Sequence, residues 1–197
     1  MSSKTIEYYE SQAAEYSSAT QSVDMSSLYA EFLPFMPQKG HILDAGCGSG
    51  RDALYFKNHG FKVSAFDAST AMAYIASELL QQPVKVLKFD QLEDKDLYDG
   101  IWCCASLLHV SYDKLAAVFK KLCRGLKADG LIYISFKYGD SERKEGSRHF
   151  TDLNESRLAA ILQETSGLTL IKSWQTLDQR PERKLEVWFN ALLTKLA

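Results

Sequence analysis

The stretch ILDAGCGSGRD, from Ile42 to Asp52, decides the fold of this chain. It joins a short apolar run to three glycines at alternate positions, and helix-forming residues follow. Glycine has no Cβ atom, so the backbone can turn sharply here and a ligand can approach it closely. A helix that begins at this point offers unpaired N–H groups to the same ligand. The stretch therefore predicts a strand, a ligand-binding turn and a helix in succession.

Short apolar runs alternate with helical segments on both sides of this stretch. The expected helices are 52–59, 69–80 with Ser69 as its N-cap, and 112–126, and the expected strands are 41–44, 61–66, 84–89, 100–104 and 131–136. This alternation predicts a parallel sheet with helices on both faces. Right-handed crossovers bring the loops after the strands to one edge, where open α/β sheets bind ligands.

The two ends of the chain have other patterns. Two helices are expected before the first strand, at 4–16 and at 25–35, the second with Asp24 as its N-cap. A charged loop at 137–153, a helix at 154–165 and two β-rich runs at 168–177 and 184–193 are expected after the fifth strand. The two runs have no helix between them, so they should pair antiparallel. We expect one domain over 1–197, with residues 1–38 covering the ligand and 137–153 lying over the cleft.

Composition narrows the class of protein. The chain has 197 residues, 46% hydrophobic and 24% charged, with a net charge of -2, which suits one globular domain. A dedicated nucleic-acid binder would need surplus Lys and Arg. No run reaches the about 18–20 apolar residues of a membrane span, and the first residues lack a signal-peptide pattern, so a cytoplasmic protein is expected. The four cysteines form no C-x-x-C pair, so no metal site is predicted.

Acidic residues surround the glycine loop. Asp44 precedes it and Asp52 follows it; both would repel a pyrophosphate and favour a cationic ligand. S-adenosylmethionine carries an ammonium and a sulfonium and has no phosphate. From Gly48 the loop also satisfies G-x-G-x-x-A, so a dinucleotide stays an alternative. Asp67 ends the second strand, where a carboxylate can accept both ribose hydroxyls; Asp90, which ends the third, can reach an adenine amino group.

Five motifs occur in order between Tyr8 and Lys137: LDAGCGSG, FDAS, KFDQL, YDGIWCCASLLHV and LKADGLIYISFK. Together they resemble the class I S-adenosylmethionine-dependent methyltransferases. GCGSGRDA and SLLHV are similar to the small bacterial members described as tellurite-resistance-like. The resemblance implies an α/β, doubly wound, Rossmann-like sheet of seven strands in the order 3-2-1-4-5-7-6, with the last strand antiparallel.

The resemblance also implies a cofactor site. The glycine loop would hold the methionine part with Asp44 near its amino group, and Asp67 would bind the ribose. Aromatic residues of the first helix would cover the cofactor, and the residues after the fourth strand would lie beside its sulfonium. The full expected set is Tyr9, Tyr16, Asp44, Gly46, Gly48, Gly50, Arg51, Asp67, Ala68, Ser69, Asp90, Gln91, Ala105 and Ser106.

His109, in SLLHV, is the candidate catalytic residue. A histidine titrates near neutrality and could take a proton from the acceptor, although it could equally only line the site. Arginine and lysine near the expected cleft suggest an anionic acceptor, unless they pair with neighbouring acids. The candidates are Lys137, Tyr138, Arg143, Arg148, Arg180 and Arg183.

The sequence thus predicts a methyltransferase that transfers a methyl group to a small-molecule acceptor by direct in-line displacement. Three alternatives stay open. They are a methyltransferase acting on tRNA or a protein side chain, a non-catalytic cofactor-binding module, and a nicotinamide-dependent oxidoreductase.

Overall fold

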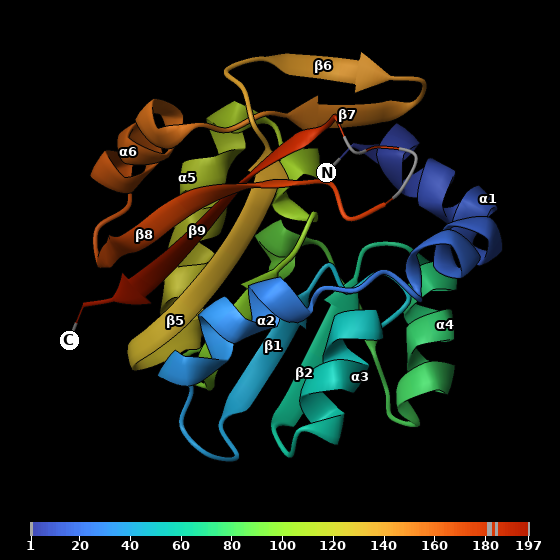
Figure 1. Ribbon diagram of the computed structural model, residues 1–197, viewed down its shortest axis with the longest axis horizontal. Helices are drawn as coiled ribbons and strands as arrows, with labels where there is room; N and C mark the ends of the chain where they lie inside the picture. Colours follow the sequence, from blue (N-terminus) through green and yellow to red (C-terminus); the bar gives the residue numbers. More distant parts are fainter. Residues whose placement is uncertain (1, 181–182, 184, 197) are drawn as a thin grey trace.

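A seven-stranded sheet forms the centre of the computed structural model, which describes residues 2–180, 183 and 185–196 (Figure 1). Its strand order is β3-β2-β1-β4-β5-β9-β8. Strands β1 to β5 pair parallel, and β9 pairs antiparallel with both β5 and β8. The strands are β1 His41–Ala45, β2 Lys62–Asp67, β3 Lys85–Val86, β4 Tyr98–Cys103, β5 Leu126–Lys137, β8 Leu168–Leu177 and β9 Val187–Lys195. The predicted fold class, strand order and antiparallel last strand are confirmed.

Helices cover both faces of this sheet (Figure 1). α2 and α3 pack on one face and α5 and α6 on the other, while α1 lies beside α4. The helices are α1 Ser3–Thr20, α2 Ser26–Phe32, α3 Arg51–Asn58, α4 Thr70–Leu80, α5 Tyr112–Gly125 and α6 Glu155–Glu164, with 3-10 turns η1 Leu33–Phe35, η2 Phe89–Gln91 and η3 Leu107–His109. The described α/β elements therefore form three layers, with the carboxyl ends of β1, β2 and β4 pointing toward α1.

Side-chain periodicity explains how each layer packs. In β1, Leu43 and Ala45 face the core beneath α5, whereas Ile42 faces the core beneath α2, because successive strand residues point to opposite faces. α5 buries a stripe of apolar residues at helical spacing: Leu115, Val118, Phe119 and Leu122. Burial on both faces makes the central strands apolar throughout.

The segment 137–153, predicted as a loop, contains a β-hairpin. β6 (Glu142–Glu145) and β7 (Arg148–Thr151) pair antiparallel around a turn at Gly146, where φ is +59°. Glu145 lies opposite Arg148 across the pair, and such opposite charges stabilise antiparallel strands. Part of the dense charge that suggested a loop thus belongs to residues that pair across the two strands of the hairpin.

Smaller differences concern element ends. The N-cap of α2 is Met25, without a side-chain hydrogen bond; Asp24 instead accepts the N–H of Ser26 at 2.9 Å. The third strand is only two residues long, because the chain turns into η2 soon after it. β9 begins at Val187; Lys184, where this run was expected to start, lies outside the described residues, as do Met1 and Ala197.

A buried carboxylate joins three of these elements. Asp52 of α3 accepts hydrogen bonds from the Tyr29 hydroxyl of α2 at 2.6 Å and from Trp102 Nε1 of β4 at 2.8 Å. Its neighbour Arg51 donates two more, at 2.6 and 3.0 Å. Asp52 is 6% exposed, so its charge depends on these four donors. The contacts hold α2 and α3 against the middle of the sheet.

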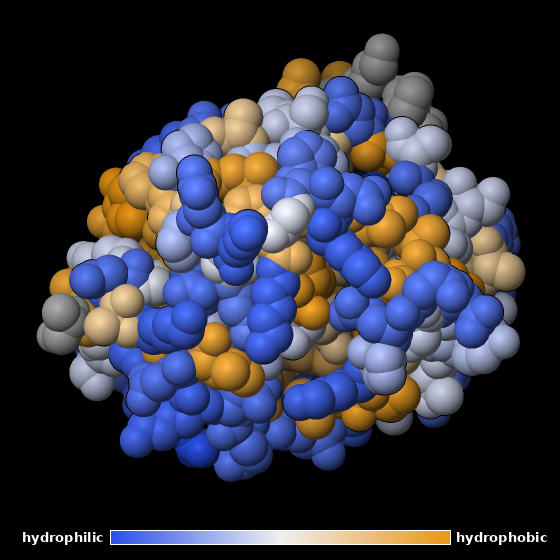
Figure 2. Space-filling model, turned by 90° about the horizontal axis from the view of Figure 1, so that it is seen from below, coloured by the Kyte–Doolittle hydropathy of each residue, from blue (hydrophilic) through white to orange (hydrophobic). Residues whose placement is uncertain are grey.

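The surface of the molecule is mixed in character. The face shown in Figure 2 is largely hydrophilic, with separate hydrophobic patches among the polar residues. None of the helices in the described part of the chain has the length and apolar character needed to cross a bilayer.

Asp52→Ala should lower the free energy of unfolding by about 3–5 kcal/mol, because the buried Tyr29 hydroxyl and Trp102 N–H would lose their acceptor and the half-buried Arg51 its carboxylate. Urea denaturation followed by circular dichroism measures this change. The matched control is Glu164→Ala on exposed α6, expected within about 0.5 kcal/mol of the parent. Equal stabilities of the two variants would show that the Asp52 contacts do not hold the fold together.

Candidate functional site

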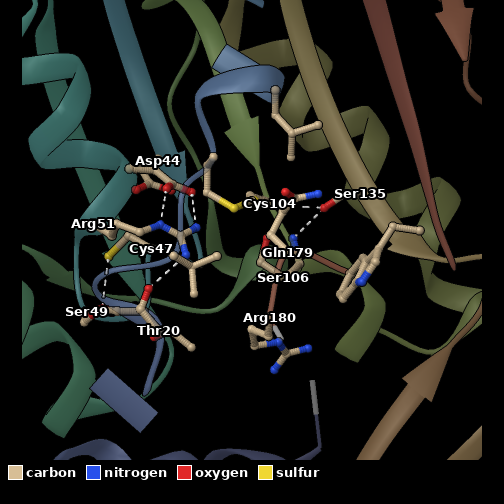
Figure 3. A pocket seen from close by; sticks show the side chains of 18 of the residues that line it. Thr20, Asp44, Cys47, Ser49, Arg51, Cys104, Ser106, Ser135, Gln179 and Arg180 are labelled. Carbon is tan, nitrogen blue, oxygen red and sulfur yellow. Dashed lines mark hydrogen bonds and ion pairs between the residues drawn. The ribbon is translucent and has the colours of Figure 1, made fainter. Parts of the chain in front are cut away.

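A cavity lies at the carboxyl ends of β1, β2 and β4 (Figure 3). It encloses about 1140 Å³, part of it open to solvent. α1, the glycine loop, the ends of β2 and β4 and the connection from β8 to β9 all contribute to its wall. The ligand edge predicted from strand–helix alternation is therefore the edge that carries the cavity.

Glycine is required at two positions of the loop for different structural reasons. Gly46 has φ +73°, and a Cβ atom there would lie 2.6 Å from Ser106 Cβ. Gly48 has φ +55°, and a Cβ atom there would have no described heavy atom within 4 Å. Gly46 therefore lets the loop after β4 approach, and Gly48 presents bare backbone to the cavity. Gly50 is not among the described residues that line the cavity; it is the N-cap of α3.

Asp44, at the end of β1, is the buried acid of the cavity floor. Its Oδ2 accepts the N–H of Ala53 at 3.0 Å, and within the described chain its Oδ1 accepts no hydrogen bond. Burial, and next the nearby Asp52 carboxylate, raise the pKa of Asp44 well above its usual range. A cationic ligand would favour the charged form, so Asp44 suits an ammonium group.

Asp67, at the end of β2, connects this strand to the glycine loop. Its Oδ2 accepts the N–H of Gly48 at 2.9 Å, and its Oδ1 accepts the N–H of Ser69 at 2.9 Å. Burial raises its pKa despite these hydrogen bonds. Each carboxylate oxygen has a second lone pair, so Asp67 can still accept hydroxyl groups from a ligand in the cavity.

Asp52 does not have the role predicted for it. The sequence suggested that its charge acts on the ligand, but four protein donors, two of them on the Arg51 guanidinium, saturate its carboxylate. Arg51 lines the cavity and also donates to the Thr20 carbonyl at 3.2 Å. The negative character beside the glycine loop therefore comes from Asp44 and Asp67, which still disfavour a pyrophosphate.

Tyr9 and Tyr16 of α1 line the cavity, with their rings edge to face at 5.1 Å between centroids. The Tyr9 hydroxyl lies 2.8 Å from His109 Nε2, and His109 Nδ1 lies 2.7 Å from the His149 carbonyl. A carbonyl can only accept, so Nδ1 carries the proton. Burial lowers the pKa of His109 to about 4; the ring is neutral at pH 7, and Nε2 accepts from Tyr9.

The other predicted cofactor residues divide into two groups. Ala105 and Ser106 line the cavity. Among the described residues, four more do not line it: Ala68, Ser69, Asp90 and Gln91. The Ser69 hydroxyl caps α4 and donates to Glu10 of α1 at 2.5 Å.

Most of the predicted acceptor-binding cations already have carboxylate partners. Lys137 Nζ lies 2.6 Å from Glu186, Arg143 pairs with Asp152, and Arg180 binds Asp178 through two nitrogens. Of the six candidates, Arg180 alone is among the described residues that line the cavity; the others are Lys137, Tyr138, Arg143, Arg148 and Arg183. These pairs argue against the predicted anionic acceptor, because a paired cation attracts an anion only weakly.

Several residues of the cavity were absent from the prediction. Thr20, Cys104, Ser135, Gln179, Trp188 and Asn190 all line it. Glu10, which lies on α1, also accepts the N–H of Ala71 in the first turn of α4 at 2.7 Å. This hydrogen bond holds α1 against α4. Cys104 and Ser135 could have been predicted, because they lie in quoted motifs near the carboxyl ends of β4 and β5. Periodicity and motifs give no signal for Thr20, Gln179, Trp188 and Asn190, which reach the cavity through the packing of distant elements.

Comparison with known proteins identifies the family. A family model described as a methyltransferase domain matches residues 17–181, most of the chain. The chain belongs to this methyltransferase family. YqeM of Bacillus subtilis, named as a methyltransferase, is 31% identical over 117 residues, which are 53% of this chain and 47% of that protein. The chain thus spans about half the length of the curated relative it matches.

Solved structures share the fold of this methyltransferase domain. The 1,6-didemethyltoxoflavin-N1-methyltransferase of Burkholderia thailandensis, solved with S-adenosylhomocysteine, superposes with a TM-score of 0.78 at 20% identity, over 98% of this chain and 88% of that one. Magnesium protoporphyrin IX methyltransferase of Synechocystis, solved with S-adenosylmethionine, has a TM-score of 0.73 at 18% identity, over 99% and 98%. The predicted class, a methyltransferase domain, is confirmed by the family model, and the predicted fold is shared with these two structures.

The pKa of His109 predicts a pH effect on stability. Its folded pKa of about 4 lies below the usual 6.5, so the unfolded chain binds this proton more readily. The contribution of the neutral ring to the free energy of unfolding is therefore fully present above pH 6.5. It is lost as the pH falls toward 4. That loss should reach about 3 kcal/mol in unfolding free energy.

Urea unfolding of the parent and of His109→Asn at pH 7 and pH 4.5 measures this contribution. The asparagine variant should lose less stability than the parent over that interval. Parallel losses in the two proteins would mean that His109 titrates alike in the folded and unfolded chains.

Proposed function

We propose that this chain transfers the methyl group of S-adenosylmethionine to a small-molecule acceptor. The observation that carries the proposal is the open space at Gly48, which lies between Asp44 and Asp67. The backbone there can approach a ligand closely, and two carboxylates flank it: Asp44, which is buried, and Asp67, which is half-buried. That combination fits a cationic nucleoside better than a phosphate ester.

The helix that lies over the cavity supports a small acceptor. α1 lies over the cavity, tied to α4 through Glu10 and to the hairpin through the hydrogen bond from His149 N–H to Thr5 Oγ1 at 3.1 Å. The Burkholderia methyltransferase of similar fold was solved with bound 1,6-didemethyltoxoflavin. The net charge of -2 gives no support to a nucleic-acid acceptor.

The likeness to tellurite-resistance-like methyltransferases is also proposed, from the motifs GCGSGRDA and SLLHV. Neither the family model nor the relatives named above carry that description. The proposed reaction does not depend on this subtype.

The bound cofactor would supply a methyl group already activated on a sulfonium, so positioning provides much of the rate. Asp44 would hold the ammonium of the methionine part, and Asp67 would accept hydroxyls of the ribose. Tyr9 and Tyr16 would cover the cofactor and exclude water. His109 also lines the cavity and fixes the Tyr9 hydroxyl, because its neutral Nε2 accepts the hydrogen bond from Tyr9.

Asp67→Ala should weaken the binding of S-adenosylhomocysteine by about 10- to 100-fold, the loss expected for hydrogen bonds to a charged group. Isothermal titration calorimetry of the full chain measures this. Asp113→Ala, an exposed acid on α5, should bind like the parent. Equal affinities of all three proteins for S-adenosylhomocysteine would show that Asp67 is not part of the binding site. Binding of NAD without binding of S-adenosylhomocysteine would favour the nicotinamide-dependent oxidoreductase.

Transfer itself can be tested with methyl-labelled S-adenosylmethionine and a small-molecule extract of bacterial cells. The parent chain should incorporate label into a low-molecular-mass product, and Asp67→Ala should incorporate at most about a tenth as much at subsaturating cofactor, following its weaker binding. Label in RNA or protein instead would change the acceptor class. Cofactor binding without any incorporation would identify a non-catalytic module.

A further inference from the structure

The cavity has a second end, formed by β4, β5, β8 and β9 rather than by the glycine loop. In Figure 3, Ser135 lies on the opposite side of the view from Asp44 and Arg51, and Cys104 lies between them. We call it the acceptor end and define it by Cys104, Ser135, Thr176, Asp178, Gln179, Arg180, Trp188 and Asn190. The cofactor proposal leaves these residues unused, so they are the ones available to a methyl acceptor.

The two charged groups of the acceptor end neutralise each other. Arg180 donates from Nε to Asp178 Oδ1 at 2.9 Å and from Nη2 to Oδ2 at 2.5 Å. Trp188 Nε1 donates to the same Oδ2 at 3.0 Å. The Asp178 side chain is only 4% exposed, and breaking a buried pair is costly. Neither charge is therefore available to bind an ionic acceptor.

The remaining polar groups of this end are uncharged. Asn190 accepts from the Tyr133 hydroxyl at 2.7 Å and donates to Thr176 Oγ1 at 3.1 Å. Ser135 Oγ accepts the N–H of Ala105 at 2.8 Å. Burial raises the pKa of the Cys104 thiol, which keeps it protonated. The acceptor end thus offers dipoles and apolar surface without net charge.

Trp188 supplies the aromatic surface. Trp102 stacks on Tyr133 at 3.9 Å between centroids, and Trp174 packs against the same tyrosine beneath Lys172. The half-buried ring of Trp188 lines the cavity and has no aromatic or cationic partner on its face among the described residues. Trp188 also packs against the apolar core around α5. The part of the indole that borders the cavity favours a flat ligand, because offset stacking adds to the gain from burial.

We propose that the acceptor is an uncharged planar molecule, aromatic or heteroaromatic, that stacks on Trp188. This inference rests on the proposed function and names its substrate class. It replaces the anionic acceptor expected from the sequence, since the cation that reaches this end, Arg180, is bound by Asp178.

Three probes of similar size test the proposal on full-length chain saturated with S-adenosylhomocysteine. They are 2-naphthol, which is planar and neutral; decahydro-2-naphthol, which is neutral and not planar; and 2-naphthoate, which is planar and anionic. Calorimetry should show 2-naphthol binding about five- to tenfold more tightly than its saturated analogue, the gain expected from aromatic stacking. 2-Naphthol should also bind more tightly than 2-naphthoate.

Variants of Trp188 locate the effect. Trp188→Leu should bring the two neutral probes to equal affinity, whereas Trp188→Phe should retain a preference for the planar one. Tyr74→Leu, which removes an aromatic side chain 67% exposed on α4, is the matched control and should keep the full preference. S-adenosylhomocysteine affinity, measured first, shows that each variant is folded.

Two results would overturn the inference while leaving the cofactor site intact. One is tighter binding of 2-naphthoate than of 2-naphthol. The other is a parent chain that binds S-adenosylhomocysteine but does not distinguish the two neutral probes. Failure to bind S-adenosylhomocysteine would instead overturn the proposed function.

Discussion

The buried carboxylate of Asp52 is the constraint on which the site depends. It lies in the first turn of the helix after the glycine loop and accepts hydrogen bonds from α2, from β4 and from Arg51. A charge at this depth is tolerated only with all of these donors in place. Satisfying it therefore sets where α2 and α3 lie on the sheet, and hence where the cavity wall stands.

The cofactor end is then assembled from segments that meet at one edge of the sheet. Asp67 accepts the N–H groups of Gly48 and Ser69 and so connects β2 to the glycine loop and to the start of α4. Glu10 bonds to the first turn of α4 and brings Tyr9 and Tyr16 over the cavity. Hydrogen bonds from backbone N–H groups to carboxylates thus position the residues of this end of the cavity. The groups proposed to contact a ligand remain available to it.

Charge divides the cavity into two chemically different ends. Asp44 and Asp67 carry no cationic side-chain partner within hydrogen-bond distance in the described chain, whereas Asp178 is fully engaged by Arg180 and Trp188. A cationic ligand is favoured at the first end, and a neutral one at the second. This division matches a reaction in which the positive charge arrives on the cofactor and the acceptor approaches from the apolar side.

Strand–helix alternation and right-handed crossovers in the sequence determined the parallel α/β sheet, the glycine turn and the placing of Asp44 and Asp67 at one edge, and the family resemblance implied the strand order. Asp90 was expected at the end of the third strand but lies in η2. Only the tertiary structure decided which charges stay free. Spacing along the chain does not show that Asp52 meets Tyr29 and Trp102, that Arg180 is taken by Asp178, or that segment 137–153 closes into a hairpin. Each of those outcomes depends on side chains brought together by packing, and burial then makes their pairing obligatory.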